Sequence, residues 1–152
     1  MISDLKFETV KIASFDCASH RLIEEITKCD FKHVIVSTGA TYNREIKKTA
    51  SILRESKKEF TLLHCISIYP TPLKEGHLER INYLKRFSDS VGLSDHSNPE
   101  INDNILSAMA MTYEIQFIEK HFTILDKNKS KDGPVSVNPS QLKELSNLTK
   151  FS

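Results

Sequence analysis

The sequence predicts an α/β fold built on a parallel β-sheet. Five short apolar runs rich in β-branched residues recur along the chain, and segments with helical spacing separate them. The repeat length, roughly 25 residues, is typical of one β-α unit. Each run also ends in a tight cluster of polar residues. Because parallel strands bring their carboxyl ends to one edge of a sheet, we expect these clusters to meet there.

Hydrophobic spacing places the elements in order. The strands are expected at 8–13, 33–37, 60–65, 90–93 and 115–118, and the helices near 19–28, 43–57, 77–87, 99–113 and 139–150. Asn43 is a suitable N-cap for the second helix. Asn98-Pro99 and Asn138-Pro139 begin the last two helices with a polar cap and a proline where no N–H is needed. The polar loop 125–136 follows the last strand, and loops of this kind often carry substrate contacts.

Composition predicts one soluble domain over residues 1–152. Apolar residues make up 39% of the chain, charged residues 27%, and the net charge is +1. This balance argues against a general nucleic-acid or membrane partner. The charge-rich stretches 44–58 and 75–86 are interpreted as solvated helix faces. Three cysteines without a C-x-x-C pair favour a reducing compartment, and we expect the cytoplasm.

The number of units leaves two topologies open. Five strands are enough for a small doubly wound sheet. A (β/α)8 barrel needs eight strands and about 250 residues, so this chain of 152 residues could form only a piece of one.

Two polar clusters predict a metal site. Ser94-Asp95-His96 and Glu119-x-His121 end neighbouring predicted strands. Neutral imidazoles bind Mn²⁺, Fe²⁺, Co²⁺ or Zn²⁺, with carboxylates and water completing the shell. Since side chains alternate along a strand, Glu119 and His121 share one face and Lys120 turns away. The alternative is that each histidine packs locally and bonds to the backbone.

A second group of residues predicts an anion site. Lys11 supplies a point charge, and the hydroxyls of Ser14, Ser37, Thr38 and Ser94 can donate to phosphate or carboxylate oxygens. Gly39 permits a tight turn and close approach of an anion. The alternative is that these hydroxyls simply end strands and cap helices.

Three further residues stay ambiguous from sequence. His64 and Cys65 are adjacent, so in a strand they point to opposite faces and cannot pair as a Cys/His nucleophile. Cys65 is interpreted as a small buried hydrophobe. His64 is either a residue of the polar edge or a core histidine. Tyr69, before Pro70, either stacks on a sugar or packs within its loop.

These clusters together resemble the sialic acid synthase (N-acetylneuraminate synthase) family. The motifs that carry the resemblance are Lys11-Ile12-Ala13-Ser14, Ser37-Thr38-Gly39, Leu63-His64-Cys65-x-Ser67-x-Tyr69-Pro70, Gly92-x-Ser94-Asp95-His96 and Ile118-Glu119-Lys120-His121-Phe122-Thr123. The resemblance implies strands four to eight of a (β/α)8 TIM barrel. It also implies a transferase of sialic acid biosynthesis that condenses phosphoenolpyruvate with an N-acetylated hexose, such as N-acetylmannosamine, and releases phosphate.

The resemblance assigns roles residue by residue. His96 and His121 would bind a divalent metal, Mn²⁺ or Mg²⁺, and Glu119 would act as an acid/base or water-orienting group. Lys11, Ser14, Ser37 and Ser94 would hold phosphoenolpyruvate, while Tyr69 and Asp132 would contact substrate. Asp132 matches the Asp of the family's Gly-Pro-Asp-His segment, although the Gly-Pro is displaced here. Ile68 stands where some members have an asparagine that contacts phosphoenolpyruvate, so one ligand contact differs.

The family's first three barrel strands and its antifreeze-like domain have no counterpart in this sequence. We therefore expect a homo-oligomer or a complementary N-terminal half-barrel chain as partner, because a half-barrel exposes two sheet edges. An alternative is a catalytically inactive half-barrel remnant that binds metal or a partner chain. A receiver-type regulatory domain is disfavoured, since Asp16 is the only candidate phosphoacceptor and no acidic pair precedes it.

Overall fold

Five parallel strands form a single curved sheet in the computed structural model, which describes residues 7–150. They are β1 (Thr9–Ile12), β2 (His33–Ser37), β3 (Glu59–Cys65), β4 (Ser90–Asp95) and β5 (Phe117–Lys120). Their order in the sheet is their order in the sequence. A doubly wound sheet would reverse its strand order at a switch point. The sequential order therefore decides between the two topologies in favour of a partial barrel.

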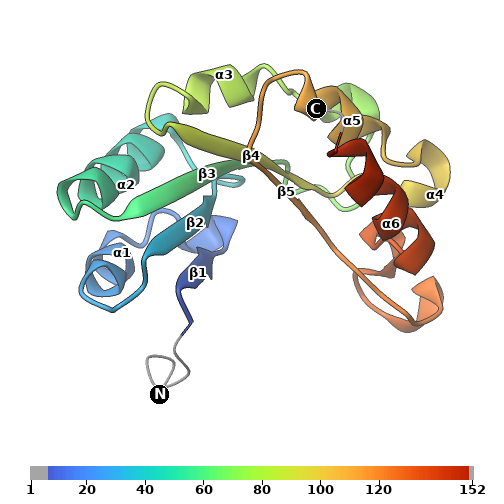
Figure 1. Cartoon of the computed structure of the whole chain (residues 1–152), viewed down its shortest axis with the longest axis horizontal. Coiled ribbons are helices and arrows are strands. Elements are labelled where there is room, and N and C mark those ends of the chain that lie inside the picture. The colour runs from blue at the N-terminus through green and yellow to red at the C-terminus, as the bar shows by residue number, and fades with distance from the viewer. Residues whose placement is uncertain (1–6, 151–152) are drawn as a thin grey trace.

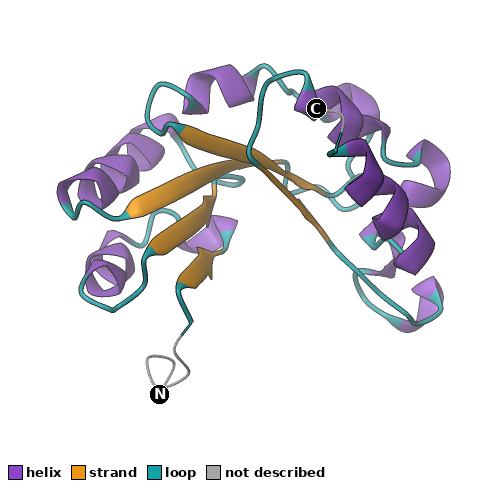
Figure 2. Cartoon of the chain, viewed as in Figure 1, coloured by secondary structure: helices purple, strands orange, loops and turns teal. Residues whose placement is uncertain are grey.

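Helices cover the convex side of this sheet (Figures 1 and 2). They are α1 (His20–Thr27), α2 (Asn43–Glu55), α3 (Arg80–Leu84), α4 (Pro99–Asn102), α5 (Ile105–Met111) and α6 (Pro139–Leu148), with short 3₁₀ turns at Ser14–Asp16, Leu73–Glu75, Lys127–Lys129 and Gly133–Val135. The apolar core lies between the strands and these helices, with Val34, Val36, Leu62 and Leu93 among its buried side chains. The concave side of the sheet is the inner side of the partial barrel.

The structure corrects the predicted helix at 99–113. This segment is two helices, α4 and α5, because Asp103 has a φ of 48° and so interrupts the helical backbone. Non-glycine residues rarely adopt a positive φ, so the helix cannot continue through this position.

The predicted N-cap of α2 is also wrong. Tyr42 is the N-cap, and its backbone N–H donates to Glu45 in a capping box. The side-chain oxygen of Asn43 accepts a hydrogen bond from Arg80 instead. The caps predicted at Asn98 and Asn138 are confirmed, since each accepts a hydrogen bond from the first turn of its helix.

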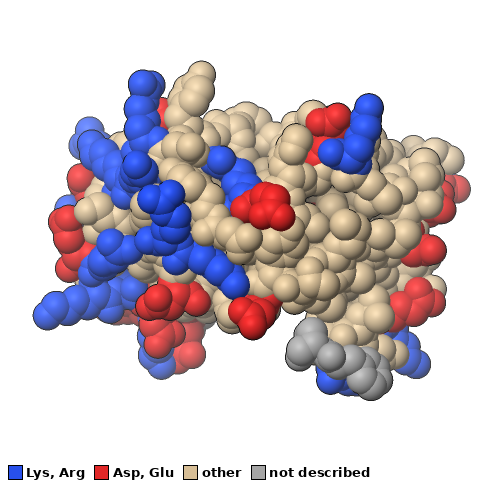
Figure 3. Space-filling model, turned by 90° about the horizontal axis from the view of Figure 1, so that it is seen from above, with Lys and Arg blue, Asp and Glu red and all other residues tan. Residues whose placement is uncertain are grey.

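Lysine and arginine side chains gather on the outer surface at the end of the molecule that carries α2 (Figure 3). Lys47 and Lys48 of this helix are exposed, while Ile46, Ala50 and Leu53 are buried beneath them. This arrangement is the solvated helix face predicted from the sequence. Among residues 7–150, the structure contains no helix with the length and apolar character needed to cross a bilayer.

His64 faces the helices and not the inner side of the sheet. It lies on the same face of β3 as Leu62, is fully buried, and its Nε2 donates to the carbonyl oxygen of Gly76 at 2.7 Å. The two sequence interpretations are thus resolved in favour of a core histidine. Burial lowers the pKa of His64 below its ordinary value of about 6.5, because the charged imidazolium loses its hydration there.

This pKa shift predicts acid destabilisation. Since the unfolded chain binds more protons than the folded chain, the contribution of His64 is complete above pH 6.5 and is lost as the pH falls towards the lower folded-state pKa. One such group changes the free energy of unfolding by at most about 1.4 kcal/mol per pH unit. Urea unfolding of the wild type and of His64→Gln between pH 7.5 and 5 should show a shallower pH dependence in the variant. Equal slopes in both proteins would contradict this assignment, because the other histidines contribute equally to both.

Candidate active site

All nine residues to which the family resemblance assigns a role line one cavity on the concave side, at the carboxyl ends of the strands. The cavity has a volume of about 590 Å³. Its lining comprises Lys11, Ala13, Ser14, Phe15, Ser37, Cys65, Ser67, Tyr69, Ser94, His96, Glu119, His121, Lys131 and Asp132. Each of the five strands contributes through its end or the residues that follow it. The predicted convergence of the polar clusters therefore occurs.

Glu119 connects the two edge strands across the hollow of the sheet. Its Oε1 lies 3.3 Å from the Lys11 Nζ of β1 and accepts a hydrogen bond of 2.7 Å from the Ser94 hydroxyl of β4. One oxygen of this carboxylate thus meets both a cation and a hydroxyl donor, which fix its position in the cavity. Glu119 can therefore serve as a proton acceptor or orient a water molecule in the cavity.

His96 is held in one tautomer by its neighbours. Its Nδ1 lies 2.9 Å from the carbonyl oxygen of Ile66, so Nδ1 must carry the proton and donate it. Nε2 then presents its lone pair to the cavity, where the Tyr69 hydroxyl donates to it at 2.8 Å. The rings of Tyr69 and His96 stack with centroids 4.1 Å apart. Burial lowers the pKa of His96, which favours the neutral imidazole that a metal requires.

Tyr69 is part of the cavity wall. Desolvation, assisted by the negative charges of Asp132 and Glu119, raises the pKa of its hydroxyl to about 12. The phenol thus stays protonated and remains a donor throughout the physiological range. Its ring also meets His121 edge-on, with centroids 5.7 Å apart. The Tyr69 ring therefore contacts both histidines and also lines the cavity.

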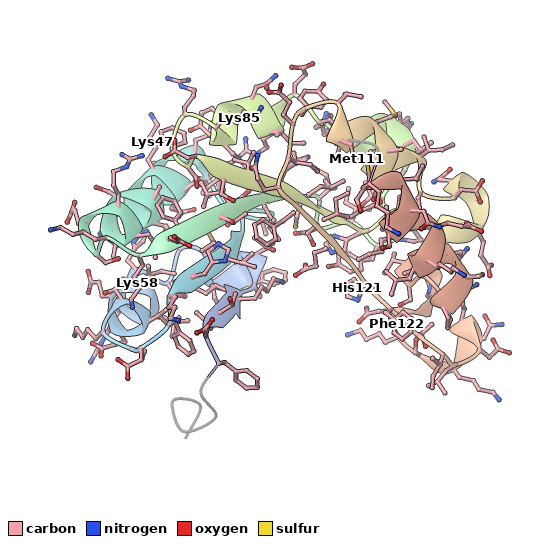
Figure 4. All side chains as sticks on the ribbon, viewed as in Figure 1. Lys47, Lys58, Lys85, Met111, His121 and Phe122 are labelled. Atoms are coloured by element: carbon pink, nitrogen blue, oxygen red, sulfur yellow. The ribbon has the colours of Figure 1, made fainter. Side chains whose placement is uncertain are left out.

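His121 extends from the end of β5 towards the hollow of the arc (Figure 4). Its ring centroid lies 5.3 Å from that of His96, and its Nδ1 lies 3.8 Å from a carboxylate oxygen of Asp132. No group of three or more histidine, cysteine, aspartate or glutamate residues within residues 7–150 is arranged to hold a metal ion. A metal here would thus take two imidazoles from the protein and its other ligands from water or substrate. This donor set suits Mn²⁺, Fe²⁺ or Co²⁺ better than Mg²⁺, which prefers oxygen ligands.

Ser37 carries the clearest sign of a ligand. Its hydroxyl is buried at the end of β2 and has no hydrogen-bond partner among residues 7–150. A buried hydroxyl without a partner is costly, so its position on the cavity wall favours an acceptor atom supplied by a ligand or water. Thr38 behaves differently, because its hydroxyl donates to the carbonyl oxygen of Leu63 and serves the fold.

Gly39 packs closely against Ser14, Cys65 and Ser67 because it has no side chain. Its backbone N–H donates to the Ser14 hydroxyl at 3.1 Å, and that hydroxyl lies 3.1 Å from the Cys65 sulfur. A Cβ at position 39 would come within 2.6 Å of both Cys65 and Ser67. Cys65 is therefore buried, as predicted, yet it also lines the cavity.

Sequence reasoning missed two other polar residues of the cavity. Ser67 stands within a quoted motif and Lys131 within the polar loop, but neither was singled out for a role. The signal for Lys131 was its place next to Asp132. A larger hollow of about 990 Å³ adjoins the cavity through Cys65 and Ser67, but its lining lacks the histidines and carboxylates of the smaller one.

Comparisons with known proteins agree with this architecture. The chain is 30% identical to N-acetylneuraminate-9-phosphate synthase of Drosophila melanogaster, over 99% of this chain and 40% of that protein. It is 34% identical to N,N'-diacetyllegionaminic acid synthase of Campylobacter jejuni, over 95% of this chain and 43% of that protein. The crystal structure of N-acetylneuraminic acid synthetase from Leptospira borgpetersenii, in complex with citrate, superposes with a TM-score of 0.87 at 32% identity, over 97% of this chain and 50% of that one.

The chain thus spans about half the length, or less, of these relatives. Its five strands correspond to part of a TIM barrel, as the motifs predicted. A sequence profile described as the NeuB family matches residues 1–150, and we conclude that the chain belongs to the NeuB family, the sialic acid synthase family.

Proposed function

We propose that the chain carries the phosphoenolpyruvate- and metal-binding part of a sialic-type acid synthase. One observation supports this most strongly: a lysine, three serine hydroxyls and a pair of histidines line the same cavity. The reaction joins C3 of phosphoenolpyruvate to the aldehyde carbon of an N-acetylated hexose. Water adds at C2 of phosphoenolpyruvate, and phosphate leaves by cleavage of the C2–O bond.

The roles follow from the contacts in the cavity. Lys11 and the hydroxyls of Ser14, Ser37 and Ser94 would bind the phosphate and carboxylate of phosphoenolpyruvate and fix its orientation. Glu119, paired with Lys11, would orient or deprotonate the water that adds at C2. Tyr69 and Asp132, which line the same cavity, would contact the sugar.

His96 and His121 would hold the divalent metal, and the donor set favours Mn²⁺ over Mg²⁺. When bound, such a metal polarises the aldehyde oxygen of the sugar. The relatives named above differ in the nine-carbon acid that their names describe. We accordingly propose the substrate class, an N-acetylated hexose, and not one sugar.

Both edge strands leave backbone groups unpaired. β1 pairs only with β2, and β5 only with β4, among the strands of residues 7–150. Open edges favour pairing with further strands. We propose that additional β-α units complete the barrel, whether on a longer polypeptide or on a partner chain.

Calorimetric titration with phosphoenolpyruvate tests the proposal. We expect saturable binding that tightens in the presence of Mn²⁺. His96→Ala should abolish the tightening, because it removes one of two imidazoles and Mn²⁺ then has too few protein ligands. His77→Ala is the matched control, since His77 is exposed and lies outside the cavity.

The outcomes separate the alternatives. Binding that requires Mn²⁺ and His96 supports a preformed anion-and-metal site. A folded sample that binds no phosphoenolpyruvate, with or without Mn²⁺, would favour the inactive half-barrel remnant. Full turnover by the monomeric chain alone would contradict the proposal that further strands complete it.

A further inference from the structure

A buried ion pair lies directly behind the cavity, on the helix-facing side of the sheet. Asp95 and Lys120 are opposite each other in the register of β4 and β5. Their side chains are 0% and 2% exposed, and the Lys120 Nζ lies 3.1 Å from the Asp95 Oδ1. The two residues that flank each of them in the chain line the cavity. The pair thus joins the two strand ends that supply both histidines.

Both charges converge on Ser97, the residue after His96. Lys120 donates to the Ser97 carbonyl oxygen at 2.9 Å and lies 3.3 Å from its hydroxyl. Asp95 accepts from the Ser97 backbone N–H at 2.7 Å, and its other oxygen accepts from Ser107 of α5 at 2.7 Å. The segment that carries His96 is therefore fixed on both sides by contacts from β4, β5 and α5.

Stability alone gives a weak reason for this arrangement. Burial lowers the pKa of Lys120, because removing the ammonium group from water is costly. The negative charge of Asp95 opposes this shift only in part. Replacing a buried ion pair with apolar residues of similar volume is often neutral or stabilising. What an apolar pair cannot supply is a directed set of hydrogen bonds to the backbone of Ser97, the residue directly after His96.

We propose that Lys120 is a positioning residue for His96. By holding Ser97, it sets the direction in which the His96 imidazole meets Ile66, Tyr69 and the cavity. The purpose of this positioning rests on the proposed function, whereas the geometry is independent of any ligand. The pair also explains why a lysine follows Glu119 and precedes His121 while pointing away from both.

The test is NMR detection of the histidine tautomers in the ligand-free, ¹⁵N-labelled chain. In the wild type, long-range ¹H–¹⁵N correlations should show His96 as a single Nδ1–H tautomer. The double variant Asp95→Leu, Lys120→Met removes both charges together, so it should fold but lose the single-tautomer pattern of His96. His64 is the internal control, because its bond to Gly76 fixes the Nε2–H tautomer away from the pair.

An unchanged His96 pattern in the folded double variant would overturn the proposal and leave the pair a purely structural role. If the double variant does not fold, Lys120→Gln is the second variant, because it removes the ammonium group while Asp95 keeps its bonds to Ser97 and Ser107. It should shift the His96 signals in the same direction by a smaller amount, and unchanged signals would again overturn the proposal. Because no ligand is present, failure of phosphoenolpyruvate binding would count against the proposed function and not against this inference.

Discussion

Gly92→Ala is expected to lower the free energy of unfolding by about 3 kcal/mol, the upper part of the range for overpacking a core. Gly92 lies on the concave side of β4, opposite Phe117 in the register with β5. A Cβ there would come within 2.3 Å of the Phe117 carbonyl oxygen and 2.6 Å of Leu63. The first contact is with the backbone of a paired strand, which cannot move without weakening the β4–β5 pairing. Urea unfolding followed by circular dichroism measures the loss.

Gly76→Ala is the matched control. A Cβ at position 76 would also meet an atom at 2.6 Å, but this atom is the end of the Leu106 side chain, which can rotate away. We expect the control to cost markedly less than Gly92→Ala. If Gly92→Ala lost as little stability as Gly76→Ala, the backbone of β5 would have to shift at little cost. The pairing of β4 and β5 would then be less rigid than the ion pair between Asp95 and Lys120 implies.

The strands and their polar ends were predictable because the information is local. Val34 and Val36 alternate with Ile35 and Ser37, which sets one face towards the helices and the other towards the cavity. The same alternation could have resolved His64, which shares its face with the core residue Leu62. The strand order was not predictable from such patterns, since hydrophobic periodicity says nothing about which strands pair.

Errors at the helix ends had visible signals. The break between α4 and α5 falls in Asn102-Asp103-Asn104, residues that favour turns, and Glu45 stands three residues after the true N-cap Tyr42.

The long-range contacts of the site could not be predicted from the sequence. The predicted set converges on one cavity, but the bonds among its members come from separate strands, such as Lys11 with Glu119. Likewise, the alternation in β5 predicted that Lys120 turns away, yet it could not name Asp95 and Ser97 as its partners. Contacts between residues more than 20 positions apart depend on topology, which local patterns do not encode.

Ser37→Ala is expected to weaken phosphoenolpyruvate binding by roughly 10- to 100-fold, while the free energy of unfolding stays level or rises by up to about 1 kcal/mol. A hydrogen bond to a charged group contributes about 1.5–3 kcal/mol, which sets the loss of affinity. The gain in stability has a separate cause. The Ser37 hydroxyl is buried without a partner in the described part of the chain, so its removal relieves a desolvation cost. Calorimetry and urea unfolding measure the two effects on one sample.

General damage to the fold would lower both phosphoenolpyruvate affinity and stability, so it could not produce weaker binding together with unchanged or higher stability. Ser88→Ala is the control, because the Ser88 hydroxyl donates to the Phe60 carbonyl oxygen and lies outside the cavity. It should lower the free energy of unfolding by about 1 kcal/mol and leave phosphoenolpyruvate binding unchanged. If Ser37→Ala destabilised the chain as much as Ser88→Ala and bound phosphoenolpyruvate normally, Ser37 would be an ordinary strand-end serine. The proposed anion site would then consist of Lys11, Ser14 and Ser94 alone.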